Sequence, residues 1–222
     1  MKAVIFDMYE TLITHYNCPI YFGAQMAKDA GIDEERYVSE WRRLEDARTL
    51  GKMTFEDVVK KILEDNKCYT DSTYKTIVEK RLATQGECFK HMHEEIILLL
   101  DALKKRKILV GLISNCFSEE AKLIRKSVLF PYFDEVCLSY EEGVKKPDEE
   151  IYHRCMSRLG VKAEECIYVG VGGSNELQTA RKLGMKPLQA VWYLKDGTLQ
   201  ASKRMDDFVQ VESPMDILEY ID

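Results

Sequence analysis

Short apolar runs alternate with longer amphipathic segments along most of the chain. Such runs are typical of strands that are buried on both faces of a parallel sheet. We predict five of these strands, at residues 3–6, 108–113, 135–138, 166–170 and 188–192. Helical patterns follow the later strands, over residues 119–126, 149–159 and 175–183. This alternation predicts an α/β fold with a parallel sheet and right-handed crossovers.

The interval between the first two predicted strands has a different pattern. The amphipathic helices that it predicts cover residues 21–30, 34–49, 54–65 and 72–82. Thr54 with Asp57 forms a capping-box pattern that favours a helix start at this point. We therefore expect a helical insertion, residues 15–87, in a sheet domain made of residues 1–14 and 88–222. A helix over residues 94–107 would return the chain to that domain.

Composition and charge exclude several classes of protein. The 222 residues are 45% hydrophobic and 32% charged, as in ordinary globular proteins. The net charge of −6 leaves no basic excess for nucleic-acid binding. The first apolar run is too short for a signal peptide, and residues 96–100 are too few to cross a bilayer. Seven scattered cysteines without Cys-x-x-Cys spacing favour free thiols in a cytoplasmic protein, not a zinc site or disulfide framework.

Polar residues follow the ends of four predicted strands. They are Asp7, Tyr9 and Thr11 after the first strand, Ser114 and Asn115 after the second, Lys145 to Asp148 after the third, and Gly172 to Glu176 after the fourth. The carboxyl ends of parallel strands lie at one edge of a sheet, which is where ligands bind in such folds. We therefore expect these groups to line one pocket.

Four motifs, in this order, resemble those of the haloacid dehalogenase (HAD) superfamily. They are Phe6-Asp7-x-Tyr9-x-Thr11-Leu12, Ile113-Ser114-Asn115, Lys146-Pro147-Asp148, and Val169-Gly170 through Glu176 with Ala180. The resemblance covers the whole chain. It implies a three-layer Rossmann-like core with an α-helical bundle cap inserted after the first motif. It also implies a hydrolase that acts on a small anionic substrate.

The resemblance implies a role for each matched residue. Asp7 would be the nucleophile and would form an ester intermediate that water then hydrolyses. Ser114 would bind the oxyanion of the substrate, and Lys146 would hold the negative charges of the site together. The further candidates for substrate binding are Thr11, Asn115, Arg42, Gly172 and Gly173.

Two positions depart from the pattern of the superfamily's phosphatases. Tyr9 stands where they carry the aspartate that protonates the leaving group, and losing a general acid typically costs about 10²–10⁴ in rate. Val171 stands where they carry an Mg²⁺-binding aspartate, and valine offers no oxygen. The sequence therefore leaves open whether Mg²⁺ is a cofactor. A weakened site would use Asp7, Tyr9 and Glu176, with Asn175 as an alternative ligand.

The dehalogenase branch of the superfamily offers another interpretation. Tyr9 is the residue seen in that branch, where halide leaves without a proton. Trp41-Arg42 resembles the tryptophan–arginine pair whose arginine receives the halide. Val171 differs, because that branch has a serine there. Three hypotheses thus stand: hydrolysis of a phosphate monoester, favoured by the commonness of that activity in the superfamily; metal-free hydrolysis of a 2-haloacid; and an anion-binding protein without turnover.

Several candidates also have a structural alternative. Arg42 is favoured to pair with Glu45 or Asp46 on its own helix. Glu176 could serve only as a first-turn acid that suits the helix dipole. Residues 172–173 could form only a tight turn. The sequence does not indicate an oligomeric state.

Overall fold

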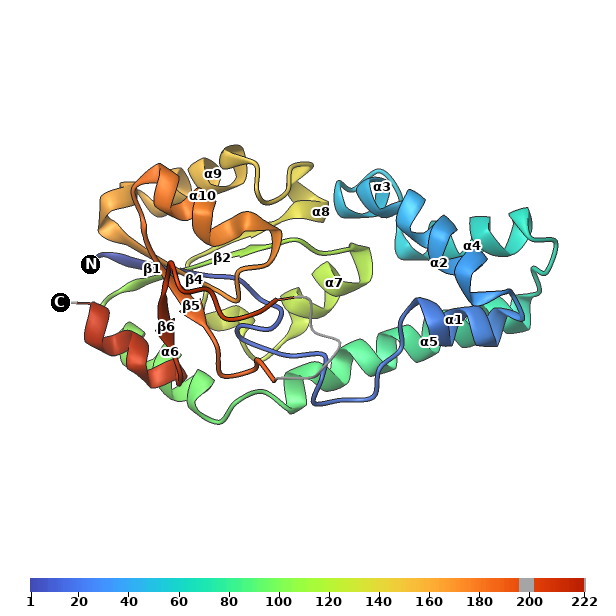
Figure 1. Cartoon of the computed structure of the whole chain (residues 1–222), viewed down its shortest axis with the longest axis horizontal. Coiled ribbons are helices and arrows are strands. Elements are labelled where there is room, and N and C mark those ends of the chain that lie inside the picture. The colour runs from blue at the N-terminus through green and yellow to red at the C-terminus, as the bar shows by residue number, and fades with distance from the viewer. Residues whose placement is uncertain (196–201, 222) are drawn as a thin grey trace.

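Six parallel strands form one sheet, in the order β3-β2-β1-β4-β5-β6, in the computed structural model (Figure 1). The structure describes residues 1–195 and 202–221. The strands are β1 (Ala3–Phe6), β2 (Leu109–Ser114), β3 (Glu135–Leu138), β4 (Cys166–Gly170), β5 (Lys186–Ala190) and β6 (Val209–Val211). Because β1 pairs with both β2 and β4, its end lies in the middle of the sheet edge.

Helices cover both faces of this sheet and make three layers (Figure 1). They are α6 (Glu95–Lys105), α7 (Ser118–Lys126), α8 (Ser139–Glu142), α9 (Glu149–Leu159) and α10 (Glu176–Leu183), with short 3₁₀ helices at Cys88–Lys90, Phe130–Tyr132, Ala163–Glu165, Gly173–Asn175 and Pro214–Tyr220. Successive side chains of β1 point to opposite faces. Val4 and Phe6 pack in one cluster with α6 and α7, whereas Ala3 and Ile5 pack in a second cluster with α9 and α10.

Five helices between β1 and α6 form a separate unit, which we call the cap and which lies to the right in Figure 1. They are α1 (Gly23–Ala30), α2 (Glu34–Arg43), α3 (Glu45–Thr49), α4 (Phe55–Asp65) and α5 (Asp71–Glu87). The cap has its own hydrophobic cluster, which includes Met26, Tyr37, Phe55 and Ile62. The boundaries expected for it, residues 15–87, stay a prediction.

The predicted α/β class with a parallel sheet is confirmed, and three details differ. The fifth strand begins at Lys186, two residues before its predicted start. The sixth strand was not predicted, because its three residues run from exposed to buried and carry no continuous apolar signal. The helix expected over residues 34–49 breaks at Leu44, which ends α2 and precedes α3. Among the described helices, none is long and apolar enough to span a membrane.

Candidate active site

Asp7 is the first residue after β1 and lies at the centre of the sheet edge. Its backbone N–H donates to the Val169 carbonyl at 2.8 Å, which continues the pairing with β4 by one residue. Its carboxylate is buried, with 7% of the residue exposed. Thr11 follows four residues later in a turn, and its hydroxyl approaches Asp7 Oδ2 at 3.5 Å. The buried strand therefore fixes one carboxylate at the edge where ligands bind in this type of fold.

Lys146 bridges Asp7 and a second buried carboxylate, Glu176. Its Nζ lies 2.5 Å from Asp7 Oδ1 and also bonds to Glu176 Oε2. All three side chains are buried. Since one ammonium faces two carboxylates, this buried cluster carries a net negative charge whenever both carboxylates are ionised. The third and fourth motifs are thus brought to the first motif, as the pattern of strand ends predicts.

The position of Glu176 is fixed from several sides. Its Oε1 accepts the backbone N–H of Gly172 at 3.0 Å, and its Oε2 accepts the Tyr168 hydroxyl at 3.0 Å. Tyr152 donates its hydroxyl to the Glu176 carbonyl at 3.3 Å. Glu176 is therefore more than a first-turn acid of α10. Tyr168 is a site residue that we did not predict; its only sequence signal is its place in the buried fourth strand.

Asn115 clamps the backbone of Lys146 from both sides. Its Nδ2 donates to the Lys146 carbonyl at 2.9 Å, and its Oδ1 accepts the Lys146 N–H at 2.8 Å. The peptide bond from Lys146 to Pro147 is cis. Asn115 thus orients the lysine, although it was predicted as a substrate-binding residue, and it also lines the cleft described below.

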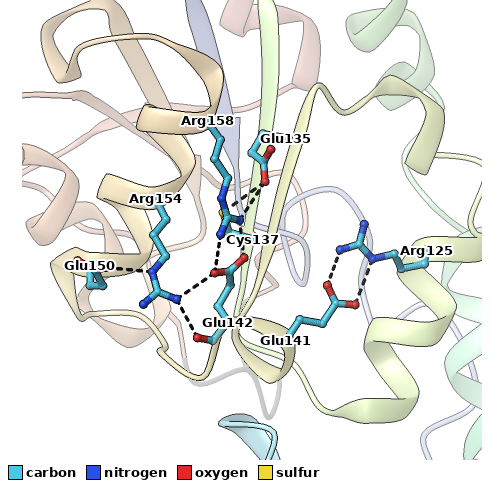
Figure 2. A network of polar contacts seen from close by, with 8 residues as sticks. All are labelled: Arg125, Glu135, Cys137, Glu141, Glu142, Glu150, Arg154 and Arg158. Atoms are coloured by element: carbon cyan, nitrogen blue, oxygen red, sulfur yellow. Dashed lines mark hydrogen bonds and ion pairs between the residues drawn. The ribbon is translucent and has the colours of Figure 1, made fainter.

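The segment that leads into Lys146 is anchored by an ion-pair network (Figure 2). Glu142, the last residue of α8, accepts from Arg154 at 3.0 Å and from Arg158 at 2.5 Å, both on α9. The neighbouring Glu141 accepts from Arg125 of α7. Most of these groups are part-exposed, so each pair contributes only modestly to stability. Their main effect is on position, because they hold α8 in place, and α8 ends four residues before Lys146.

Burial and charge shift the acidities of this cluster. Burial, and then the negative charge of Glu176, raise the pKa of Asp7 to about 7, although Lys146 opposes the shift. Burial alone would lower the pKa of Lys146, but the two carboxylates reverse the effect and raise it. The lysine is therefore always charged at neutral pH, while Asp7 gains and loses its proton there.

Ser114 ends β2, the strand that pairs with β1 and ends at the same edge of the sheet as Asp7. It is fully buried, and its hydroxyl has no hydrogen-bond partner within residues 1–195 and 202–221. A buried hydroxyl normally finds a partner, so an unpaired one at a ligand-binding edge offers a donor for an absent group. This position is compatible with the oxyanion contact that we expected of Ser114.

A tight turn joins β4 to α10. Gly172 has a φ of +99°, a conformation that favours glycine, and Ser174 and Asn175 also have positive φ values. The turn aims the Gly172 N–H at Glu176, so its clearest role is to place that carboxylate. Val171 is buried, and its carbonyl accepts from Gln189 Nε2 at 2.9 Å.

A cleft of about 330 Å³ lies between the cap and this edge of the sheet. Its lining residues are Glu45, Thr49, Asn115, Phe117, Lys145, Lys146, Pro147, Ser174 and Asn175. The cap therefore contributes α3 to the site. Arg42, which we expected to bind substrate, is exposed on α2 and is not among the residues that line the cleft. The helix break at Leu44 separates it from α3.

A different arginine packs beside the cleft. Arg48 of α3 is buried, and its guanidinium lies 3.5 Å from the centre of the Trp41 ring and 4.1 Å from that of Phe117. Burial lowers its pKa to about 10, although Glu119 opposes the shift. The available signal was the spacing of seven residues from Trp41 to Arg48, which in the unbroken helix expected over residues 34–49 would place both on one face.

Tyr9 lies apart from the bridge between Asp7 and Lys146. Its ring stacks on His15 with centroids 4.6 Å apart. Burial and the nearby Glu120 raise its pKa above the usual value, so its hydroxyl is a weak acid here. Glu120 belongs to a buried cluster in which Arg81 of α5 pairs with Glu119 at 3.1 Å and with Glu120 at 2.8 Å. This cluster joins the cap to α7 and was not predicted.

The metal ligands expected at Asp7, Tyr9 and Glu176, with Asn175 as an alternative, stay a prediction. In the part of the chain that the structure describes, no three His, Cys, Asp or Glu side chains are arranged to hold a metal ion. Lys146 Nζ stands between the two carboxylates, where a shared cation would stand. Val171 adds no oxygen. The carboxylates of Asp7 and Glu176 are thus paired with an ammonium, and no third acidic side chain completes a set of ligands for a divalent cation there.

Comparison with known proteins assigns the family. Residues 1–184 match the haloacid dehalogenase-like hydrolases. A glyceraldehyde 3-phosphate phosphatase of Methanocaldococcus jannaschii is 29% identical over 198 residues, which cover 83% of this chain and 82% of that protein.

Solved structures show the same fold across the whole chain. A 2-haloacid dehalogenase from Pseudomonas syringae has a TM-score of 0.70 at 21% identity, covering 99% of this chain and 97% of its own. A HAD family enzyme from Bacteroides thetaiotaomicron, in complex with magnesium and inorganic phosphate, has a TM-score of 0.63 at 21% identity, covering 90% and 98%. With the family match over residues 1–184, this chain belongs to the haloacid dehalogenase-like hydrolases.

Proposed function

We propose that the chain hydrolyses a small phosphate monoester and that Asp7 is its nucleophile. The observation that carries the proposal is the Lys146 ammonium held between two buried carboxylates at the sheet edge. Lys146 contacts Asp7 Oδ1, so Oδ2 is the oxygen that attacks. The phosphatase name of the Methanocaldococcus jannaschii relative supports phosphate as the group transferred.

The proposed reaction has two steps. The Asp7 carboxylate attacks phosphorus, the bond to the leaving oxygen breaks, and an aspartyl phosphate forms. Water then attacks this intermediate, which releases inorganic phosphate and restores Asp7. Ser114 donates its unpaired hydroxyl to a phosphoryl oxygen, and Lys146 offsets the negative charge that gathers in the dry site.

The leaving group receives little help from the protein in this scheme. Tyr9 has a raised pKa and lies beside His15, so it is poorly suited to donate a proton. The proton for the leaving oxygen then comes from solvent. We therefore propose that the substrate has a leaving group that is stable as an anion, such as a phenol or an enol.

The discriminating experiment is a screen of aryl phosphates, alkyl phosphates and short 2-haloacids. We expect phosphate release that is at least about 10²-fold faster from aryl than from alkyl phosphates, because general-acid help is weak. Equal rates for the two ester classes would contradict the proposed source of the proton. Absence of phosphate release from every ester would contradict the proposed function.

Removal of metal is expected to leave activity nearly unchanged. Among the described residues no third acidic side chain joins Asp7 and Glu176 to hold a divalent cation, and Lys146 already supplies positive charge. Phosphate release should therefore stay within about twofold in excess chelator, since no charge stabilisation is lost. Rates measured with EDTA, with EDTA followed by Mg²⁺, and without either addition test this point. Loss of activity in EDTA that Mg²⁺ restores would contradict the metal-free site.

Activity is expected to rise with pH between about 5 and 8, because the nucleophile must be ionised. Asp7 is protonated below its pKa of about 7 and becomes a carboxylate above it. Lys146, with a raised pKa, stays charged over this range. A pH profile of kcat/KM should thus show one ascending limb with a midpoint near 7. A flat profile from pH 5 upwards would show that Asp7 is already ionised at low pH.

Metal-free dehalogenation is the second candidate. The observation that favours it is the same lysine bridge, because displacement of halide by Asp7 needs neither a metal ion nor a proton donor. Release of chloride from a 2-chloro acid in excess EDTA, without phosphate release from any ester, would establish it in place of the phosphatase.

A further inference from the structure

Two segments of the chain connect the cap with the sheet domain, and they run side by side. The first precedes α1, and the second follows the end of α5. His15 Nε2 in the first lies 2.9 Å from Gln85 Oε1 in the last turn of α5, just before the second. Close by, the sulfur atoms of Cys18 and Cys88 lie 3.0 Å apart. The connections therefore meet at a pair of thiols.

The two thiols differ in their surroundings. Cys18 is half-buried, and its Sγ lies 3.3 Å from the His15 carbonyl. Cys88 is buried, and its Sγ lies 3.7 Å from the Thr84 carbonyl. Burial raises the pKa of Cys88, so this sulfur is protonated at neutral pH. Cys18 is therefore the sulfur that a dissolved reagent reaches first.

We propose that Cys18 and Cys88 are a redox modification site that forms a reversible disulfide across the two connections. The sulfurs need to approach by about 1 Å to reach bonding distance. The oxidant is a low-molecular-weight disulfide of the glutathione class. This site does not depend on the reaction that Asp7 performs.

The chemistry is two successive thiol–disulfide exchanges. The Cys18 thiolate attacks one sulfur of oxidised glutathione, which forms a mixed disulfide and releases one glutathione thiolate. Cys88 then loses its proton to solvent and attacks Cys18 Sγ, which forms the protein disulfide and releases the second glutathione. The protein gives up two electrons and two protons, and one oxidised glutathione becomes two reduced molecules.

The fold gives this cross-link a mechanical consequence. The cysteines are 70 residues apart, and all five cap helices lie between them. A bond between them closes that length of chain into a loop and joins both connections at one point. Movement of one connection relative to the other is then restricted. The oxidised protein should hold its cap more rigidly over the cleft.

A second close pair, Cys137 of β3 and Cys155 of α9, provides an internal comparison. Both are fully buried where α9 packs on the sheet, and a contact between their sulfurs raises the pKa of Cys155. Neither thiol is exposed to a dissolved oxidant. The two sulfurs are close, but a dissolved oxidant does not reach them. We therefore expect Cys137 and Cys155 to stay reduced while Cys18 and Cys88 react.

The test treats the full-length protein with oxidised glutathione and maps its cysteines by mass spectrometry. We expect a peptide that contains Cys18 linked to Cys88, formed without a denaturant and removed by a thiol reductant. Cys88→Ser should stop at a glutathione adduct on Cys18, and Cys18→Ser should leave Cys88 unmodified. Cys68→Ser, which removes another half-buried thiol, should behave as the natural chain does.

Hydrogen exchange supplies the mechanical readout. Amides in residues 15–22 and 85–90 should exchange more slowly after oxidation and recover after reduction. Free thiols at both Cys18 and Cys88 after oxidation, or a stable glutathione adduct on Cys18 in the natural chain, would overturn the proposal. Formation of the disulfide without slower exchange would overturn the proposed restraint on the connections.

Discussion

Asp7→Asn is expected to reduce phosphate release by at least about 10⁴-fold, with little change in fold. Removal of a nucleophile costs about this much or more in enzymes that use covalent catalysis. The amide has nearly the shape of the carboxylate, so the contacts with Lys146 and Thr11 are retained in form. The substitution also removes one negative charge from a cluster in which two carboxylates face one ammonium. The measurement is single-turnover phosphate release on protein whose circular dichroism matches that of the natural chain.

Asp46→Asn is the matched control for this substitution. Asp46 also pairs with a lysine, Lys145, at 2.6 Å, but its side chain is 76% exposed and it stands outside the residues that line the cleft. Activity should stay within about twofold, because exposed ion pairs contribute little. Turnover by Asp7→Asn at more than about one hundredth of the natural rate would remove Asp7 as the nucleophile.

The sheet and its edge could be predicted because their signals are local. Continuous apolar runs marked five of the strands, and parallel pairing brings their ends together whatever the details of packing. The sequence therefore placed Asp7, Ser114 and Lys146 at one edge. The strand β6 was not predicted, because its three residues lie at the edge of the sheet and include too few buried positions to give an apolar pattern.

The contacts that decide the chemistry are not local, and these could not be predicted. Whether Lys146 bridges two carboxylates or only one depends on the side-chain direction of Glu176, which a backbone turn and Tyr168 fix. The pairing of Arg81 with two glutamates of α7 depends on how the cap docks. The helix break at Leu44, which the motif resemblance does not indicate, leaves Arg42 on α2 and outside the residues that line the cleft, so its role in substrate binding stays a prediction.

Lys146→Met removes the bridging ammonium and is expected to lower both the stability and the activity of the protein. Lys146→Met should lower the free energy of unfolding by about 3–5 kcal/mol, because it leaves the buried carboxyl groups of Asp7 and Glu176 without a positive charge beside them. The pKa of Asp7 should rise further, since the attraction that opposed its shift is gone. Activity at neutral pH should fall, because less of the nucleophile is ionised.

The stability loss of Lys146→Met should depend on pH with a definite sign. A buried acid with a raised pKa destabilises the folded state once pH exceeds its unfolded value of about 4, and the effect grows until pH reaches the folded value. The deficit relative to the natural chain should therefore be small near pH 4 and larger near pH 8. Urea unfolding at both pH values measures it. Lys145→Met, beside it but part-exposed, should cost less than about 1 kcal/mol at either pH.

Glu176→Gln, combined with Lys146→Met, separates the loss of the bridge from simple damage to the core. The glutamine keeps an oxygen for the Gly172 N–H and removes one of the two uncompensated charges. The double variant should therefore regain about 1–2 kcal/mol over Lys146→Met alone, although Glu176→Gln by itself is destabilising. Its activity should remain low, because Asp7 still lacks its cation. Additive losses in the double variant would mean that Lys146 and Glu176 do not interact, and the bridged site would have to be abandoned.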